Sequence, residues 1–152
     1  MRQLIIARKD LNMSSGKLAV QVSHASMAFL SNIIRQGRKH EVLSLDTAET
    51  DHYEITIQMA PDVYDDWLCG IFIKTICEAK NRNQLVKAVA MAEELGLKEG
   101  EDFFLIKDNC LTELEPEEIG EDGIGRTLTC IGFRPLPDDI AHQISRKYQL
   151  FK

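Results

Sequence analysis

The sequence contains no long apolar run. A membrane-spanning helix needs about 20 predominantly apolar residues, and no segment approaches that length. Near the N-terminus, the apolar run Leu4–Ala7 is also far too short for the core of a signal peptide. These absences predict a soluble, cytoplasmic protein that does not act within a membrane.

The cysteines and histidines lack the spacings that metal sites need. No two cysteines form a C-x-x-C pair, and the histidines are scattered. Reduced and partly buried thiols in a reducing cytosol explain the cysteines best. We therefore expect neither a metal nor another cofactor. The residues concerned are Cys69, Cys77, Cys110, Cys130, His24, His40, His52 and His142.

A nucleotide-binding phosphate loop is also absent, although Gly16 and Lys17 stand next to each other. A Walker loop has a glycine where this chain has Leu11, and a Ser or Thr where it has Leu18. Nucleotide hydrolysis is therefore poorly supported. Lys17 instead falls in the first turn of a predicted helix, where free backbone N–H groups favour an anion.

The net charge of −6 hides a strong asymmetry. Residues 1–40 carry seven Lys or Arg and one acid, whereas the rest of the chain carries eleven basic and twenty-three acidic residues. Such a molecule can bind a phosphate backbone on one face and stay acidic overall. Ordinary variation of surface charge along a chain explains the same asymmetry equally well.

Hydrophobic patterns predict an alternation of strands and helices. Ser14 or Ser15 can cap a first helix that ends near Gln36, with Gly37 as its stop. Asn81 can cap a later helix that ends at Gly96. Strands are expected at 4–7, 53–59, 71–77, 103–106 and 126–133, a short helical segment at 61–67, a last helix from Pro137 to about Tyr148, and an irregular connection at 38–52.

This alternation predicts an α/β fold in a single domain over residues 1–152. We expect a three-layer α/β/α sandwich around a mixed sheet of about four strands, with an extra strand-like insertion near 53–59. The apolar residues around Met59 and Trp67 are compatible with a homodimer as well as with a monomer.

One polar stripe crosses the otherwise apolar first helix. Lys17, Gln21 and His24 recur at intervals of four and three residues, which puts them on one face. They could line a cleft. The simpler alternative is that Lys17 and Gln21 are solvated and that His24 is a hydrogen-bonded core histidine.

Polar residues also follow or lie within the predicted strands near the end of the chain. Asp108 stands at the carboxyl end of a strand, where α/β sheets build their sites, and Thr112 follows four residues later. Thr127 and Thr129 are two residues apart on the last strand and so share a face. An Asp after a strand is also a common turn residue.

The segment from Arg8 to Ala25 resembles the opening motif of type 2 peptidyl-tRNA hydrolases, the archaeal and eukaryotic kind. That motif reads Arg-x-Asp-Leu-x-Met-x-x-Gly-Lys-x-Ala-x-Gln-x-x-His-Ala and matches almost position for position. The segments 105–108 with Thr112, and 127–132, resemble the family's second motif and last strand. The resemblance implies hydrolysis of the ester that joins a peptide to tRNA.

The resemblance also assigns roles to single residues. Asp108 would orient or deprotonate a water, and Lys17 would stabilise negative charge or keep Asp108 ionised. Thr112 and Thr129 would hydrogen-bond the substrate or Asp108, and His24 would support the site. The expected substrate contacts are Arg8, Lys9, Gln21, Arg35, Arg38, Lys39 and Thr127, the basic ones meeting phosphates.

The chain departs from the family in the segment after Asp108. The family usually has Asp-Ala-Gly-Arg/Lys-Thr-Gln, whereas this chain has Asn109, Cys110, Leu111, Thr112 and Glu113, followed by an acidic loop. These departures motivate an alternative function, a catalytically silent module on the same fold that binds tRNA, other RNA or a protein.

Overall fold

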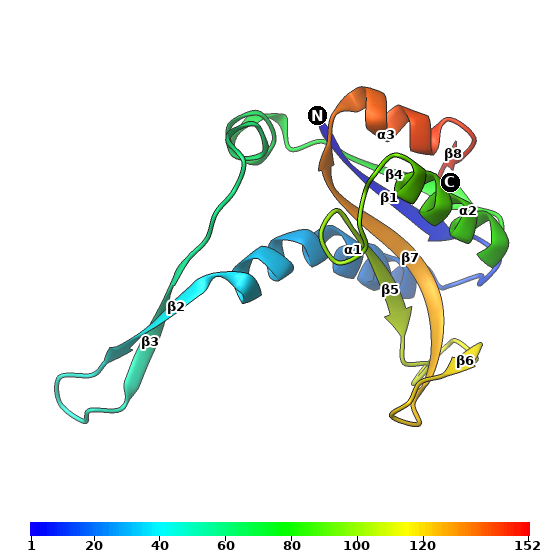
Figure 1. Ribbon diagram of the computed structural model, residues 1–152. Coiled ribbons are helices and arrows are strands. Elements are labelled where there is room, and N and C mark those ends of the chain that lie inside the picture. The colour runs from blue at the N-terminus through cyan, green and yellow to red at the C-terminus, as the bar shows by residue number, and fades with distance from the viewer.

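The computed structural model describes residues 1–152, and its core is a mixed sheet (Figure 1). The four long strands are β5 (Phe103–Asp108), β7 (Gly125–Leu136), β1 (Arg2–Arg8) and β4 (Lys74–Ala79), in that spatial order. Strands β1 and β4 are parallel, and β7 is antiparallel to both β1 and β5. Two short strands, β6 (Glu118–Ile119) and β8 (Gln149–Leu150), extend the sheet beyond the predicted four strands.

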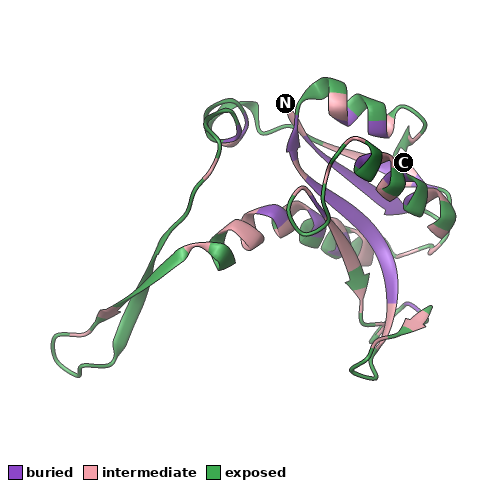
Figure 2. Cartoon of the chain, viewed as in Figure 1, coloured by how far each residue is buried: buried purple, intermediate pink, exposed green.

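Helices cover both faces of this sheet, so the predicted three-layer α/β/α sandwich is confirmed. Helix α1 (Ser15–Gln36) packs on one face, where Ala25 lies against Ile5 and Cys130. Helices α2 (Arg82–Glu94) and α3 (Asp138–Ser145) pack on the other face over the larger hydrophobic cluster. Figure 2 shows the central strands as the most buried part of the chain, as their near-continuous apolar sequences require.

The helix boundaries follow the local signals in the sequence. Ser14 accepts a hydrogen bond from the Lys17 amide at the start of α1, and Asn81 accepts one from the Gln84 amide at the start of α2. Gly37 and Gly96 follow the two helices as expected. Helix α3 ends at Ser145, earlier than predicted, because residues 149–150 pair with β4.

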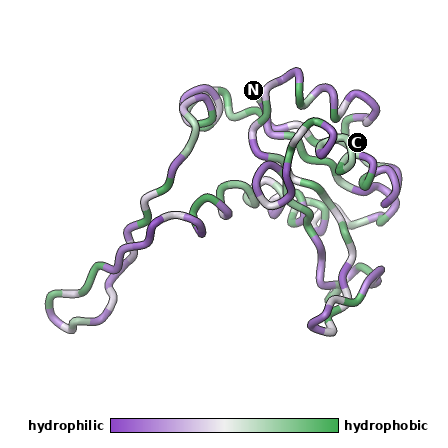
Figure 3. The backbone as a smooth tube through the Cα atoms, in the orientation of Figure 1, coloured by the Kyte–Doolittle hydropathy of each residue, from purple (hydrophilic) through white to green (hydrophobic).

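The prediction of an irregular connection at 38–52 is wrong. Residues Arg38–Leu43 form β2, which pairs with β3 (Thr50–Thr56) in a two-stranded antiparallel hairpin outside the main sheet. The hairpin projects away from the body, and nearly all of it is exposed (Figures 1 and 2). Because neither face of β2 is buried, its sequence lacks the apolar alternation that reveals a strand, and Figure 3 shows mostly hydrophilic residues where the hairpin leaves α1.

The predicted strand at 71–77 and the dimer contact suggested around Trp67 also need correction. The strand expected at 71–77 begins only at Lys74, because residues up to Ile71 belong to the helical segment η1 (Val63–Ile71) and Phe72 has a left-handed backbone. Trp67 is fully buried against Phe29 and Val63, with Met59 packed beside them. Trp67 is therefore not available for the dimer contact that the sequence allowed.

Candidate active site

The topology brings the start of α1 next to the end of β5. Strands β1 and β5 both run antiparallel to β7, so their carboxyl ends lie at the same edge of the sheet. The loop after β1 leads into α1 at Ser15, and β5 ends at Asp108. The crevice outside the carboxyl ends of strands is where α/β folds usually bind ligands.

Lys17 and Asp108 form an ion pair at this edge. Lys17 Nζ lies 2.7 Å from Asp108 Oδ2, and the two side chains are only 13% and 11% exposed. Burial alone raises the pKa of Asp108. The hydrogen bonds from Lys17, the Cys110 amide and Gln21, together with the Lys17 charge, outweigh burial and lower the pKa below its ordinary value. Asp108 is therefore a carboxylate at neutral pH.

Gln21 is the second donor to the same carboxylate oxygen. Its Nε2 lies 2.8 Å from Asp108 Oδ2, and its Oε1 accepts the Thr129 hydroxyl at 2.7 Å. Gln21 is 2% exposed. The alternative that Gln21 is solvated is thus ruled out. Thr129 contacts Gln21 rather than Asp108, so it does not hydrogen-bond the carboxylate directly as the resemblance allowed.

A bulge in the sheet aims Thr129 at α1. The register between β5 and β7 shifts after the pair Ile106 and Cys130, so that Lys107 pairs with Leu128 and Thr129 is the extra residue. Such bulges redirect side chains and are common beside active sites. The bulge puts Thr129 on the same side of the sheet as Cys130, which packs under α1.

Thr112 and the turn after β5 complete the surroundings of the ion pair. Thr112 Oγ1 accepts a hydrogen bond from Lys17 Nζ at 3.2 Å. Cys110 has a left-handed backbone with φ 55°, and its amide donates to Asp108 Oδ1 at 2.9 Å. A glycine adopts that conformation without strain, which gives a physical reason for the glycine that the family has here.

The ion pair borders an open hollow of about 330 Å³. His24 lines it and is exposed, so it is not the core histidine of the alternative interpretation. Seven of the eight lining residues carry polar side chains. The lining residues are Lys17, Gln21, His24, Lys107, Asp108, Asn109, Leu111 and Thr112.

Lys17 and Thr112 have hydrogen-bond donors that no protein group uses, and these can bind an oxygen atom of a substrate in the hollow. An ammonium group has three N–H donors. Lys17 uses two of them, on Asp108 and Thr112. The third remains for an oxygen that develops negative charge. The Thr112 hydroxyl accepts from Lys17 and keeps its own proton to donate, so the site pairs a carboxylate with donors for an oxyanion.

Arg8 is not available as a substrate contact. Its side chain is 3% exposed, and its five N–H groups meet Asp10, Glu117 and the Leu128 carbonyl at 2.6–3.1 Å. Burial lowers the pKa of Arg8, but the hydrogen bonds and charges of Glu117 and Asp10 reverse that effect and raise the pKa. Arg8 therefore anchors the segment after β5 instead of meeting a phosphate.

Thr127 is likewise corrected from a substrate contact to an internal one. It is fully buried, donates to the Glu115 carbonyl at 2.6 Å and accepts from the Glu117 amide at 3.1 Å.

Lys9 contacts Glu78 and the Lys152 carbonyl but is 45% exposed. Arg35, Arg38 and Lys39 are exposed, at the end of α1 and the start of β2.

Three of the six acids between Glu113 and Asp122 form ion pairs within the fold. Glu117 pairs with Arg8, Glu118 with Lys107 and Arg82, and Asp122 with Arg126. These pairs reduce the negative charge that the acidic loop presents to RNA. The loop was one of the two departures that motivated the silent module, and the other, at residues 109–113, is unchanged by them.

Sequence reasoning did not assign a role to Glu113. Its carboxylate accepts hydrogen bonds from the Ser14 hydroxyl at 2.5 Å and the Ser14 amide at 3.0 Å. The Ser14 hydroxyl, followed by its amide, lowers the pKa of Glu113. Glu113 thus holds the start of α1, where a bound anion would otherwise be favoured. The only signal in the sequence is the acid at the family's glutamine position.

Comparison with known proteins identifies the family. The family model described as "Peptidyl-tRNA hydrolase PTH2" matches residues 1–151. A peptidyl-tRNA hydrolase of Methanopyrus kandleri is 30% identical over 88% of this chain and 84% of its own length. Those of Thermococcus onnurineus and Saccharolobus solfataricus are each 25% identical over 98% of this chain and cover 96% and 98% of their own lengths. The chain therefore belongs to the PTH2 family of peptidyl-tRNA hydrolases.

Proposed function

We propose that Lys17 and Asp108 together carry the reaction of this enzyme. As a member of its family, the chain hydrolyses the ester bond of peptidyl-tRNA and releases free tRNA and peptide. The observation that carries the proposal is the short, shielded contact between Lys17 Nζ and Asp108 Oδ2, at 2.7 Å beside an open hollow.

Asp108 holds the attacking water. Its Oδ2 already accepts from Lys17 and Gln21, whereas its Oδ1 accepts one amide, from Cys110. A free lone pair on Oδ1 can therefore accept a water proton. Because its lowered pKa makes Asp108 a weak base, orienting the water and relaying its proton are its main tasks.

Lys17 stabilises the oxygen that becomes negative. The water oxygen attacks the carbonyl carbon, and the third N–H of Lys17 and the Thr112 hydroxyl donate to the carbonyl oxygen. The bond between that carbon and the ribose oxygen then breaks, and the ribose oxygen takes up the proton that the water has lost. One donor of this kind contributes about 10²- to 10³-fold to kcat.

The remaining site residues position the reacting groups or the RNA. Gln21 fixes the Asp108 carboxylate and keeps one N–H for the substrate, and Thr129 holds the Gln21 amide. His24 borders the hollow and can contact the terminal nucleotide. Of the cations near the N-terminal half, Lys9, Arg35, Arg38 and Lys39 are exposed enough to meet tRNA phosphates.

Hydrolysis of an N-blocked aminoacyl-tRNA tests the proposal. Lys17→Met and Asp108→Asn should each lower kcat by about 10²-fold or more with little change in KM. Lys98→Met with Glu101→Gln removes an exposed ion pair far from the hollow and serves as the matched control. If both site variants keep wild-type kcat while the control does too, the assignment of Lys17 and Asp108 is lost.

Three broader predictions accompany the proposal. A cytoplasmic location fits an enzyme whose substrate is made on ribosomes, and none of the helices is long and apolar enough to cross a membrane. The single domain and the homodimer stay predictions, which limited proteolysis and analytical ultracentrifugation test. The absence of a cofactor also stays a prediction, tested by hydrolysis in the presence of a chelator.

A further inference from the structure

A polar stripe without acids runs the length of α1. The helix contains no Asp or Glu in its 22 residues, although the chain has 24 acids. Lys17 and Arg35 are 18 residues apart, which is about five turns at roughly 3.6 residues per turn, so they face the same direction. His24 and Ala28 lie between them on that stripe. The separation along the axis is about 27 Å at roughly 1.5 Å per residue.

The far end of this stripe carries a cluster of exposed cations, Arg35, Arg38 and Lys39, which we name the basic hinge. Neither Arg35 nor Arg38 forms an ion pair, and Lys39 approaches Glu41 at 3.8 Å with both side chains more than half exposed. Arg35 and Arg38 are therefore exposed cations without a neutralising partner, in a chain whose net charge is −6. They create local positive potential that a polyanion can use.

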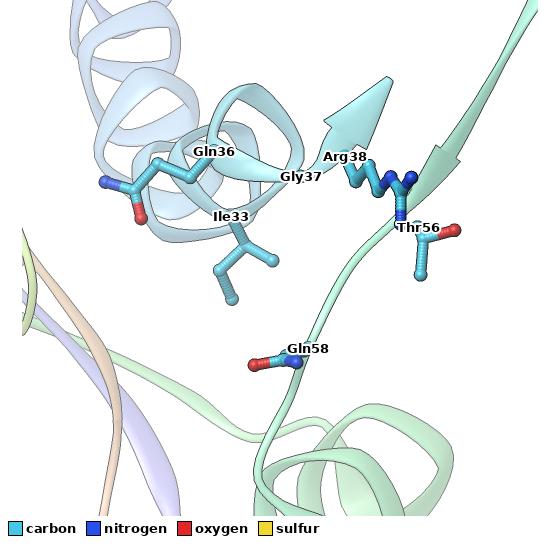
Figure 4. Close-up of a pocket in the computed structure, with 6 residues that line it drawn as sticks. All are labelled: Ile33, Gln36, Gly37, Arg38, Thr56 and Gln58. Carbon is cyan, nitrogen blue, oxygen red and sulfur yellow. The ribbon is translucent and has the colours of Figure 1, made fainter. Parts of the chain in front are cut away.

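A hollow borders Arg38 on another side of α1 from the stripe: at about 100° per residue, Ile33 and Gln36 lie roughly 160° and 100° around the helix from Lys17. The hollow measures about 580 Å³ and is lined by Arg38, four other polar or small residues without charge, and Ile33; the uncharged ones are Gln36, Gly37, Thr56 and Gln58. No acid lines it. Figure 4 shows Arg38 extending from the start of β2 toward Thr56. Ile33, from α1, and Gln58, from the chain after β3, lie on the two sides of the gap between these segments. Arg38 is the residue that this hollow shares with the basic hinge.

The hinge is held at a fixed place relative to α1. A Cβ at Gly37 would lie 2.7 Å from Ile55 Cγ2 and 2.9 Å from the Thr56 carbonyl oxygen, so the returning strand β3 touches the end of the helix. Lys39 also lies over the Tyr53 ring, 3.9 Å from its centroid. These contacts hold the base of the hairpin, and with it Arg38 and Lys39, against the end of α1.

We infer that α1 is a docking surface for the double-stranded body of tRNA, with the basic hinge binding its phosphates. The inference rests on the proposed function, which fixes the ester at Lys17. About 27 Å corresponds to roughly eight nucleotides at about 3.4 Å per nucleotide of a stacked strand. That is farther than the few unpaired nucleotides at the 3′ end of tRNA reach when they are stacked, so with a stacked 3′ end the hinge meets the paired stem.

Neighbouring residues limit where the RNA can lie. Asn32 donates to the Gly100 carbonyl, so the loop with Glu99 and Glu101 flanks one side of the helix. On the other side, Val20, Met27 and Ile34 form an exposed apolar stripe at seven-residue intervals. A second copy of the chain is the rival occupant of α1 because of that stripe, and the experiment distinguishes it from RNA.

The experiment compares two substrates that share the same ester. One is N-acetyl-aminoacyl-tRNA, and the other is the same N-acetyl-aminoacyl group on a CCA trinucleotide. In the triple variant Arg35→Ala, Arg38→Ala, Lys39→Ala, kcat/KM for tRNA relative to the trinucleotide should fall about tenfold or more. The matched control Lys87→Ala, Arg146→Ala, Lys147→Ala removes three exposed cations from the α2 and α3 layer and should keep the wild-type ratio.

Binding of uncharged tRNA across a salt series gives a second readout. Loss of three phosphate contacts should reduce the slope of log K against log salt by about 2 to 3. An unchanged ratio and slope overturn the inference, and so does a triple variant that only converts a dimer into a monomer. If the wild type hydrolyses neither ester, the proposed function fails, and the salt slope alone then decides the docking surface.

Discussion

The hydroxyl of Thr129 lies 2.7 Å from Gln21 Oε1, and this contact decides which end of the Gln21 amide faces Asp108. Because Thr129 donates to the carbonyl end, the NH₂ end must point to the carboxylate. The two residues are 108 positions apart and come from the bulge of β7 and the second turn of α1. Thr129 therefore acts on the site through Gln21.

Thr129→Val should weaken catalysis without blocking substrate binding. The variant leaves Gln21 Oε1 buried without a donor, at a cost of about 1–3 kcal/mol in the free energy of unfolding. The freed amide can turn away from Asp108, and we expect kcat to fall roughly tenfold with little change in KM. Steady-state kinetics measure both constants. Thr129→Ser keeps the hydroxyl and should have the wild-type kcat. If its kcat is as low as that of Thr129→Val, loss of the hydrogen bond to Gln21 does not explain the fall in kcat.

Lys17→Met should raise the pKa of Asp108. In the native protein the contacts from Lys17 and others outweigh burial, and removal of Lys17 leaves burial with less opposition. The ¹³C shift of the Asp108 carboxyl, followed by NMR across pH, measures the change. If Asp108 in the variant has the same pKa as in the wild type, the proposed coupling between the two residues is contradicted.

The same pair makes stability depend on pH. A carboxylate with a lowered pKa in the folded state stabilises the protein fully above its unfolded pKa of about 3.9, and that contribution is lost as pH falls through the folded value. Urea unfolding should thus show a constant gap between wild type and Lys17→Met above about pH 5. The gap should close at lower pH, and a gap that widens on acidification would disagree with the lowered pKa.

Glu113→Gln should improve substrate binding. Glu113 occupies the start of α1 with a negative charge close to Lys17, beside the hollow proposed to receive the esterified end of tRNA. Removal of one charge near a helix terminus should lower KM by roughly 2- to 5-fold. The neutral amide still accepts a hydrogen bond from Ser14. The matched control is Glu121→Gln, an exposed acid of the same segment, which should leave KM unchanged.

Gly132→Ala should destabilise the packing of α1 on the sheet. A Cβ at this position would lie 2.1 Å from the Ala25 carbonyl oxygen, a backbone atom that cannot turn aside. We expect a loss of about 3 kcal/mol in unfolding free energy, measured by denaturant titration. At Gly16 an added Cβ meets nothing within 4 Å, so Gly16→Ala is the control. Equal stabilities of the two variants would argue against this close approach.

Arg8→Met should destabilise the segment after β5. The change leaves Glu117 and Asp10, which are 29% and 33% exposed, without the guanidinium that neutralises them. We expect a cost of about 1.5–3 kcal/mol, the range for hydrogen bonds to charged groups. Hydrogen exchange of residues 115–119 should rise together with the loss of stability. Arg8→Lys cannot replace the five donors of a guanidinium and should recover only part of the loss.

Local chemistry was enough to locate most elements. Ser14 and Asn81 cap their helices through hydrogen bonds to amides three residues later, and such contacts depend only on neighbouring residues. A continuous apolar run predicts buried strands such as β1. Strand β2 escaped prediction because it is exposed on both faces and has no apolar pattern, whereas its partner β3, at Thr50–Thr56, overlaps the strand expected at 53–59.

The sequence by itself determined the fold class, the family motif, and the pairing of Lys17 with Asp108 as an expectation. Only the tertiary structure decided that Gln21 and Thr129 orient the carboxylate, that Arg8 is buried under Glu117, and that Glu113 holds the start of α1. These contacts join residues about 90 to 110 positions apart. Their partners are set by the register of β7 and the place of α1 on the sheet, and no local pattern carries that information.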